Sequence, residues 1–131
     1  MNGIYALISP DGSLVFRDGV PDHMRKDADP HHGAPSAFAI RRPAWGGHGL
    51  QCLVGGTSTL QHNTYPPNHI GAALVEGLDG PDQYIFGNLT ICGSRTASAT
   101  AELEMCGLTD AQQRLISAVH AAVADEAASS P

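Results

Sequence analysis

Glycine and proline constrain the fold of this chain most, because they divide it into short apolar segments. The sequence has 15 glycines and 9 prolines among 131 residues, and both residue types favour turns over long regular elements. Their share lies below that of a disordered chain, and 42% of the residues are hydrophobic. We therefore expect one folded domain over residues 1–126, rich in turns, with a frayed tail over residues 127–131.

Most of the apolar segments are typical of β-strands. Met1–Arg17 predicts a β-hairpin, because a β-prone run leads into Ser9-Pro10-Asp11-Gly12, a sequence that favours a turn. Further strands are expected at Ala37–Arg42, Leu50–Val54, Tyr84–Gly93 and Ala99–Met105. In the last of these, apolar residues alternate with polar ones such as Glu102 and Glu104, which predicts a strand with one wet face.

Two segments predict helices. Asn68 is the expected N-cap of the first, since apolar residues at helical spacing follow it. Thr109 and Gln112 form a capping box at the start of the second, which should run from about Asp110 to Asp125. Together these elements predict an α+β domain with a mainly antiparallel sheet of about five to six strands. Two helices should pack on one face of that sheet, the last helix being C-terminal.

The segment Asp18–Ser36 is the least regular part of the sequence. Three prolines and a cluster of charges predict a long loop, with one short helical turn near Asp22–Lys26. Large apolar residues are few, so we expect the segment to contribute little to the core. Long loops of this kind often meet a partner. The candidate partner-binding residues in this segment are Asp22, Met24 and Arg25.

Trp45 lies in a glycine-rich turn and is the one tryptophan of the chain. Such a residue is either a plug in the core or an exposed anchor for a partner, because aromatic side chains dominate protein interfaces. The sequence leaves both interpretations open. His48 follows in the same turn. We add Trp45 and His48 to the candidate partner-binding surface.

Charge and targeting features exclude several classes of protein. The formal net charge is −6, and the 7 basic residues are scattered, which argues against binding to nucleic acid. No apolar stretch is long enough to cross a membrane. The N-terminus does not have the pattern of a secretion signal, and the three cysteines form no CxxC pair. We therefore expect a cytoplasmic protein without a membrane or nucleic-acid partner.

Candidate chemistry is sparse. The chain has no GxSxG elbow and no P-loop lysine, so no catalytic residue can be named and no cofactor is expected. The alternative is a metal-dependent or small-molecule enzyme that uses histidine nitrogens and a thiolate. Its ligands would be His48, Cys52, His62 and His69. Their spacing matches no zinc motif, and on a strand residues four apart stand about 13 Å from each other.

The second half of the chain resembles a family of small proteins. An asparagine-started helix at Asn68 is followed by the apolar segment Ile85–Gly93, bounded by glycine, and by Gly107-Leu108-Thr109-Asp110-Ala111-Gln112. This order, over roughly residues 50–123, resembles small uncharacterised proteins of actinobacterial phages, plasmids and chromosomes. No function is established for that family, so no site residue can be transferred. The resemblance implies a non-enzymatic accessory protein of a mobile element.

These observations predict a cytoplasmic accessory protein that acts by binding another protein. The enzyme with loop histidines is one alternative. An acidic inhibitor that mimics DNA is the other, and 13 acidic residues are few for that role. Partner identity, and whether the chain forms a homo-oligomer, are left open by the sequence.

Overall fold

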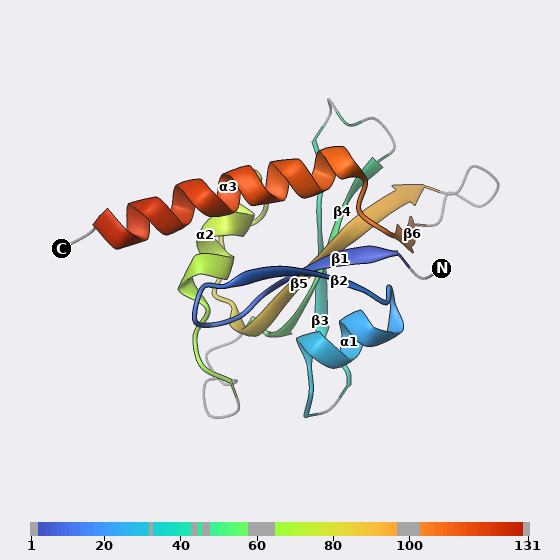
Figure 1. Ribbon diagram of the computed structural model, residues 1–131. Coiled ribbons are helices and arrows are strands. Elements are labelled where there is room, and N and C mark those ends of the chain that lie inside the picture. The colour runs from blue at the N-terminus through green and yellow to red at the C-terminus, as the bar shows by residue number, and fades with distance from the viewer. Residues whose placement is uncertain are drawn as a thin grey trace.

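The computed structural model describes residues 3–31, 33–42, 45, 48–57, 65–96 and 103–129. Within these residues the chain forms six strands and three helices (Figure 1). Their order is β1 (Ile4–Ile8), β2 (Leu14–Asp18), α1 (Asp22–Ala28), β3 (Ser36–Ile40), β4 (His48–Gly56), α2 (His69–Gly77), β5 (Phe86–Thr96), β6 (Leu103–Cys106) and α3 (Asp110–Ser129).

All strands belong to one antiparallel sheet, in the order β2-β1-β5-β4-β3. The long strand β5 has two partners on one side. Leu89–Ile91 pairs with β1, and Gly93–Thr96 pairs with β6. The α+β class, the mainly antiparallel sheet and the C-terminal helix are therefore confirmed. Residues 97–102, which include Glu102 and the first part of the predicted strand Ala99–Met105, lie outside the described residues.

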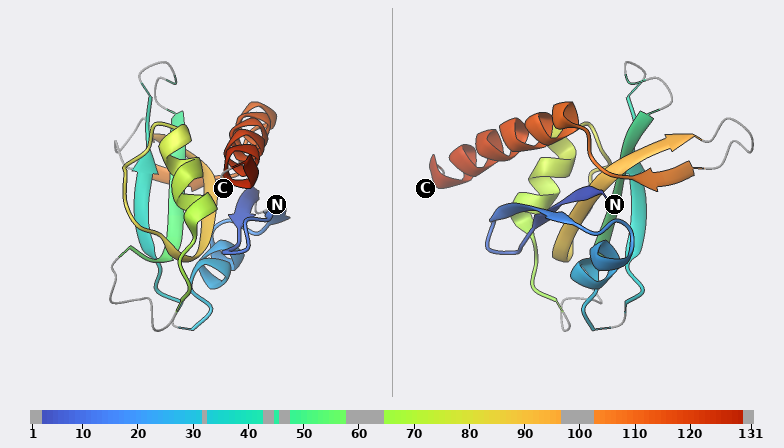
Figure 2. Two further views of the ribbon diagram at one scale, coloured as in Figure 1. Left: turned by 90° about the vertical axis from the view of Figure 1, so that its left-hand side faces the viewer. Right: turned by 45° about the vertical axis from the view of Figure 1, so that its right-hand side comes forward.

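Two helices, α2 and α3, cover one face of the sheet (Figure 2). Alternate residues of β4 point to this face, as the sequence pattern predicted, and Cys52 is among them. They pack with Leu74 of α2 and Ile116 of α3, both of which are fully buried. The helix α3 continues to Ser129, four residues past its predicted end, so residues 127–129 are helical rather than frayed.

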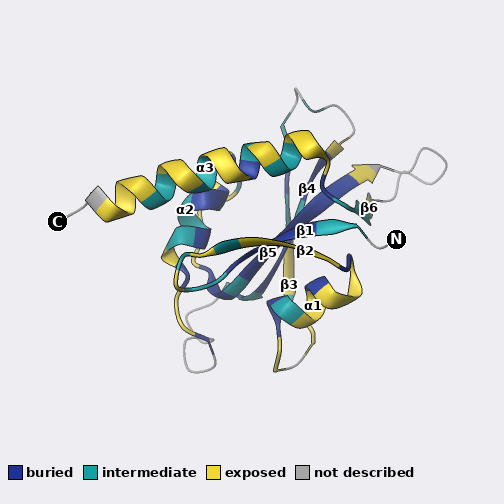
Figure 3. Cartoon of the chain, in the orientation of Figure 1, coloured by how far each residue is buried: buried dark blue, intermediate teal, exposed yellow. Residues whose placement is uncertain are grey.

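The other face of the sheet is covered by α1. The helical turn predicted near Asp22–Lys26 is a helix of 7 residues, and the expectation that the segment adds little to the core is wrong, because Met24 and Ala28 are fully buried. They pack with Tyr5, Leu53 and Cys92 on the face opposite α2 and α3. Three helices therefore cover two faces, where two helices on one face were predicted (Figure 3).

Hydrogen bonds hold α1 and its C-terminal end against the sheet. The Asp27 carboxylate accepts hydrogen bonds from the Tyr5 hydroxyl and, at 2.9 Å, from Nη1 of Arg17. Asp29 is buried and accepts from the Tyr65 hydroxyl and, at 3.2 Å, from the backbone amide of Ala34. Burial, followed by the hydrogen bond to Asp27, raises the pKa of Tyr5. These bonds make α1 a fixed part of the domain.

The predicted N-cap of α2 is confirmed, and Asn68 also joins three elements. Its Oδ1 accepts from the Gly71 amide at 2.8 Å, and its Nδ2 donates to the Ile8 carbonyl at 2.9 Å and to the Gly87 carbonyl at 2.8 Å. The side chain is 1% exposed, so these bonds satisfy a buried amide. Among the described residues, the helices are too short or too polar to span a bilayer.

Candidate functional site

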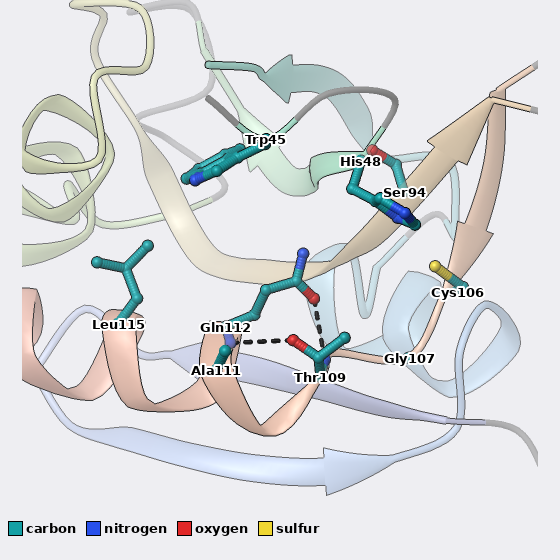
Figure 4. A pocket seen from close by; sticks show the side chains of 9 residues that line it. All are labelled: Trp45, His48, Ser94, Cys106, Gly107, Thr109, Ala111, Gln112 and Leu115. Carbon is teal, nitrogen blue, oxygen red and sulfur yellow. Dashed lines mark hydrogen bonds between the residues drawn. The ribbon is translucent and has the colours of Figure 1, made fainter. Parts of the chain in front are cut away.

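A pocket of about 340 Å³ lies between the start of α3 and the adjacent end of the sheet (Figure 4). Residues from the β3–β4 connection, β4, β5, β6 and α3 form its walls. They are Trp45, His48, Ser94, Cys106, Gly107, Thr109, Ala111, Gln112 and Leu115. Figure 4 shows Trp45 and Leu115 at one end and His48 and Cys106 at the other.

The predicted capping box builds the wall that α3 contributes. The backbone amide of Thr109 donates to Oε1 of Gln112 at 2.9 Å, and the amide of Gln112 donates to Oγ1 of Thr109 at 3.1 Å. In addition, Nε2 of Gln112 donates to the Gly49 carbonyl at 3.2 Å, which ties the helix to β4. The capping residues therefore both start the helix and fix its distance from the sheet.

Gly93 allows the elements around the pocket to approach each other. A Cβ atom at this position would lie 2.9 Å from the Gly107 carbonyl oxygen, 3.2 Å from Sγ of Cys106 and 3.2 Å from Oε1 of Gln112. Any side chain would push β6 and the start of α3 away from β5. The glycine in β5 thus allows three residues that line the pocket, Cys106, Gly107 and Gln112, to lie close to this strand.

Trp45 is both a core residue and a wall of the pocket. It is partly buried and packs against the core on the side of α2 and α3. The Arg42 guanidinium lies 5.0 Å from the centroid of the Trp45 ring, within the range of a cation–π interaction. Arg42 is held in turn by Nε bonds to the Leu78 carbonyl at 3.3 Å and to Asp79 at 3.1 Å. Trp45 therefore packs against the core and also forms part of the pocket wall, whereas its role as an anchor for a partner stays a prediction.

Among the residues that the structure describes, no aspartate, glutamate, lysine or arginine lines the pocket. Burial raises the pKa of the Cys106 thiol; Arg95 lowers this pKa and Glu104 raises it. The thiol is therefore protonated near neutral pH, and the thiolate is the nucleophilic form of cysteine. The walls provide apolar surface and neutral hydrogen-bonding groups, which suit binding of an uncharged, largely apolar group.

The structure brings together only part of the predicted partner-binding set. Trp45 and His48 line the same pocket. Asp22 and Arg25 are exposed on α1, which lies on the opposite face of the sheet. Met24 is 0% exposed and belongs to the core between α1 and the sheet, so its side chain is not available to a partner in this structure.

Of the alternative metal ligands, the three that the structure describes do not form a metal-binding group. His48 borders the pocket, Cys52 is fully buried in the core, and His69 begins α2. Burial raises the pKa of Cys52 far above its ordinary value. The fourth residue, His62, lies outside the described residues. In the described part of the chain, no group of three or more His, Cys, Asp or Glu side chains could hold a metal ion.

Sequence reasoning missed several walls of the pocket. Cys106 and Leu115 were not among the candidate site residues, and Gln112 was predicted only as a capping residue. The signal that could have found them is the capping box itself, because it begins three residues after Cys106 and therefore brings β6 and α3 into a tight corner. No family model, curated protein or solved structure matches the chain.

Proposed function

We propose that this protein is a non-enzymatic accessory protein that binds another protein, and that the pocket receives one large apolar side chain of the partner. The observation that carries the proposal is a neutral pocket walled by Trp45 and Leu115. Protein interfaces are commonly anchored by a single aromatic or aliphatic side chain that fills such a pocket.

The size of the pocket supports a side chain as its occupant. A volume of about 340 Å³ is at the small end of the range of about 300–1,000 Å³ found for small-molecule sites. A cavity of this size accommodates one large apolar side chain. The lack of charged side chains among the described lining residues disfavours phosphorylated or carboxylated metabolites, since these need a cationic partner.

The setting is also part of the proposal. The resemblance to proteins of actinobacterial mobile elements supports an accessory role, and we propose that the protein acts in the cytoplasm. A net charge of −6 supports a protein partner over a nucleic acid. The protonated state of Cys106 gives no support to a cysteine nucleophile.

The first test uses the fluorescence of Trp45, because the chain has 1 tryptophan. N-acetyl-phenylalaninamide and N-acetyl-leucinamide serve as apolar probes, and N-acetyl-glutamine amide serves as the polar control. We expect a saturable change of Trp45 emission with the apolar probes and none with the polar one. An equal response to all three would contradict an apolar pocket.

The second test identifies the partner's anchor residue. Ala111 lines the pocket, so Ala111→Phe should fill it. Ala121 is exposed elsewhere on α3, and Ala121→Phe is the matched control. Peptides selected from a random library against the native protein should contain an aromatic or large aliphatic anchor, should bind Ala121→Phe, and should lose binding to Ala111→Phe. Peptides that bind both variants equally would refute the assignment of the pocket.

A further inference from the structure

A second cavity, of about 440 Å³, lies between the first turn of α2 and the segment that connects α2 to β5. Its lining residues are Thr57, His69, Ala72, Asp82, Gln83 and Tyr84. None of them lines the pocket at Trp45, so an argument about this cavity is independent of the proposed function.

Tyr84 gives this cavity a free aromatic surface. Its side chain is 70% exposed, more than Val15 and Phe16, the other exposed large hydrophobic residues in the described part of the chain. In the same part of the chain, its ring stacks on no other aromatic ring. The face of an aromatic ring carries partial negative charge and attracts C–H bonds that carry partial positive charge. Tyr84 is therefore available as a platform for a flat C–H-rich ligand.

Four polar side chains line the same cavity, and Nε2 of one of them, Gln83, is buried without a hydrogen-bond partner in the described part of the chain. The side chains of Thr57, His69 and Asp82 make no hydrogen bond or ion pair with any part of the chain that the structure describes. A hydroxyl donates and accepts, an imidazole does both through its two nitrogens, and a carboxylate accepts. This set matches a ligand with several neighbouring hydroxyl groups, each of which donates and accepts.

The charge of the lining residues further limits the class of ligand that can bind. Asp82 is acidic, and in the described part of the chain no lysine or arginine lines the cavity. A phosphate or carboxylate ligand would meet a like charge without a cationic partner, which disfavours anions. The described residues also provide no group of three or more side chains that could hold a metal ion. A neutral ligand fits the lining best.

From the exposed ring of Tyr84 and the free polar groups beside it, we infer that this cavity binds a neutral sugar ring. One face of the ring stacks on Tyr84, and its hydroxyl groups donate to the Asp82 carboxylate and exchange hydrogen bonds with Thr57 and His69. The aromatic face supplies apolar contact, and the polar groups select for hydroxyl groups. Ligand sites commonly combine apolar surface with a few polar groups that provide specificity.

The test is a titration of the ¹⁵N-labelled protein, followed by ¹H–¹⁵N correlation spectra. The probes are the methyl glycosides of glucose, mannose, galactose and N-acetylglucosamine. At least one should give saturable shifts of the Ala72 and Tyr84 amides, with a Kd of about 1 mM, and none at Leu115 in the other pocket. Tyr84→Ala and Asp82→Asn should each raise this Kd by about tenfold or more. Phe16→Ala, which removes an exposed ring on β2, is the control and should leave it unchanged.

Three results would overturn the inference. The first is the absence of saturable shifts with all four glycosides. The second is unchanged binding in Tyr84→Ala or Asp82→Asn, with each variant shown to be folded by its dispersed spectrum. The third is a response of the same amides to inorganic phosphate or to putrescine but to no glycoside, which would assign the cavity to an ionic ligand.

Discussion

Replacement of Met24 by alanine tests the packing of α1 against the sheet. Met24 is 0% exposed and contacts the cluster that contains Tyr5, Leu53 and Cys92. Truncation of a buried methionine to alanine removes its transfer free energy and leaves a cavity, at a cost of about 2–5 kcal/mol. We expect the upper half of that range, because the hydrogen bonds of Asp27 and Asp29 limit how far α1 can move to fill the space.

The free energy of unfolding is measured by guanidinium denaturation, with Trp45 fluorescence as the signal. Trp45 lies against the core on the other face of the sheet, so it reports unfolding of the domain rather than of α1 alone. Arg25→Ala is the matched control, since Arg25 is exposed on the same helix and its loss should change stability by less than about 0.5 kcal/mol. A loss below about 1 kcal/mol in Met24→Ala would refute the packing of α1 into the core.

Three further predictions concern other parts of the molecule. Thr109→Ala should destabilise the protein by about 0.5–2 kcal/mol in the same denaturation assay, whereas Thr109→Ser, which retains the capping oxygen, should cost much less. Gly93→Ala should destabilise it by about 1–3 kcal/mol and shift Trp45 emission, because the new methyl group would lie 2.9 Å from the Gly107 carbonyl oxygen; native stability would contradict the tight corner. Burial raises the pKa of Cys92 from 9.0 to about 12. An unfolded chain releases this proton near pH 9 while the folded chain keeps it, so stability should fall as pH rises from 9 towards 12. In Cys92→Ala the free energy of unfolding should fall less steeply with pH. An equal dependence on pH in the variant and the native protein would contradict the raised pKa of Cys92.

The sequence predicted those elements whose signals are local. The capping box at Thr109, the N-cap at Asn68 and the turn at Ser9-Pro10-Asp11-Gly12 each depend on residues within a few positions of one another, and each appears in the structure. The strand predicted at Leu50–Val54 lies within β4. Such patterns are sufficient to predict an element when the interactions that form it lie within the same segment of the sequence.

The sequence predicted one helical turn at α1 but missed the burial of this helix, because the contacts that bury it are long-range. A helix of 7 residues with two buried side chains has no recognisable apolar stripe. Asp29 follows this helix, and the sequence alone indicates an aspartate exposed to solvent. In the structure Asp29 is buried, and its carboxylate accepts a hydrogen bond from Tyr65, 36 positions away. Part of the Trp45 pocket was missed for a similar reason. Cys106 faces Gly93 through the register of β5 and β6, which no local pattern reveals.

The position of β5 has a consequence for synthesis of the chain on the ribosome. The hairpins β1–β2 and β3–β4 are complete before β5 begins at Phe86, yet neither pairs with the other. Each has an unpaired edge that only β5 fills, because β1 and β4 are its neighbours in the sheet. At translation rates of about 5–20 residues per second, the nascent chain carries two open hairpins for seconds before the central strand joins them. During synthesis, the unpaired edges of β1 and β4 can therefore pair with an incorrect strand until β5 occupies the position between them.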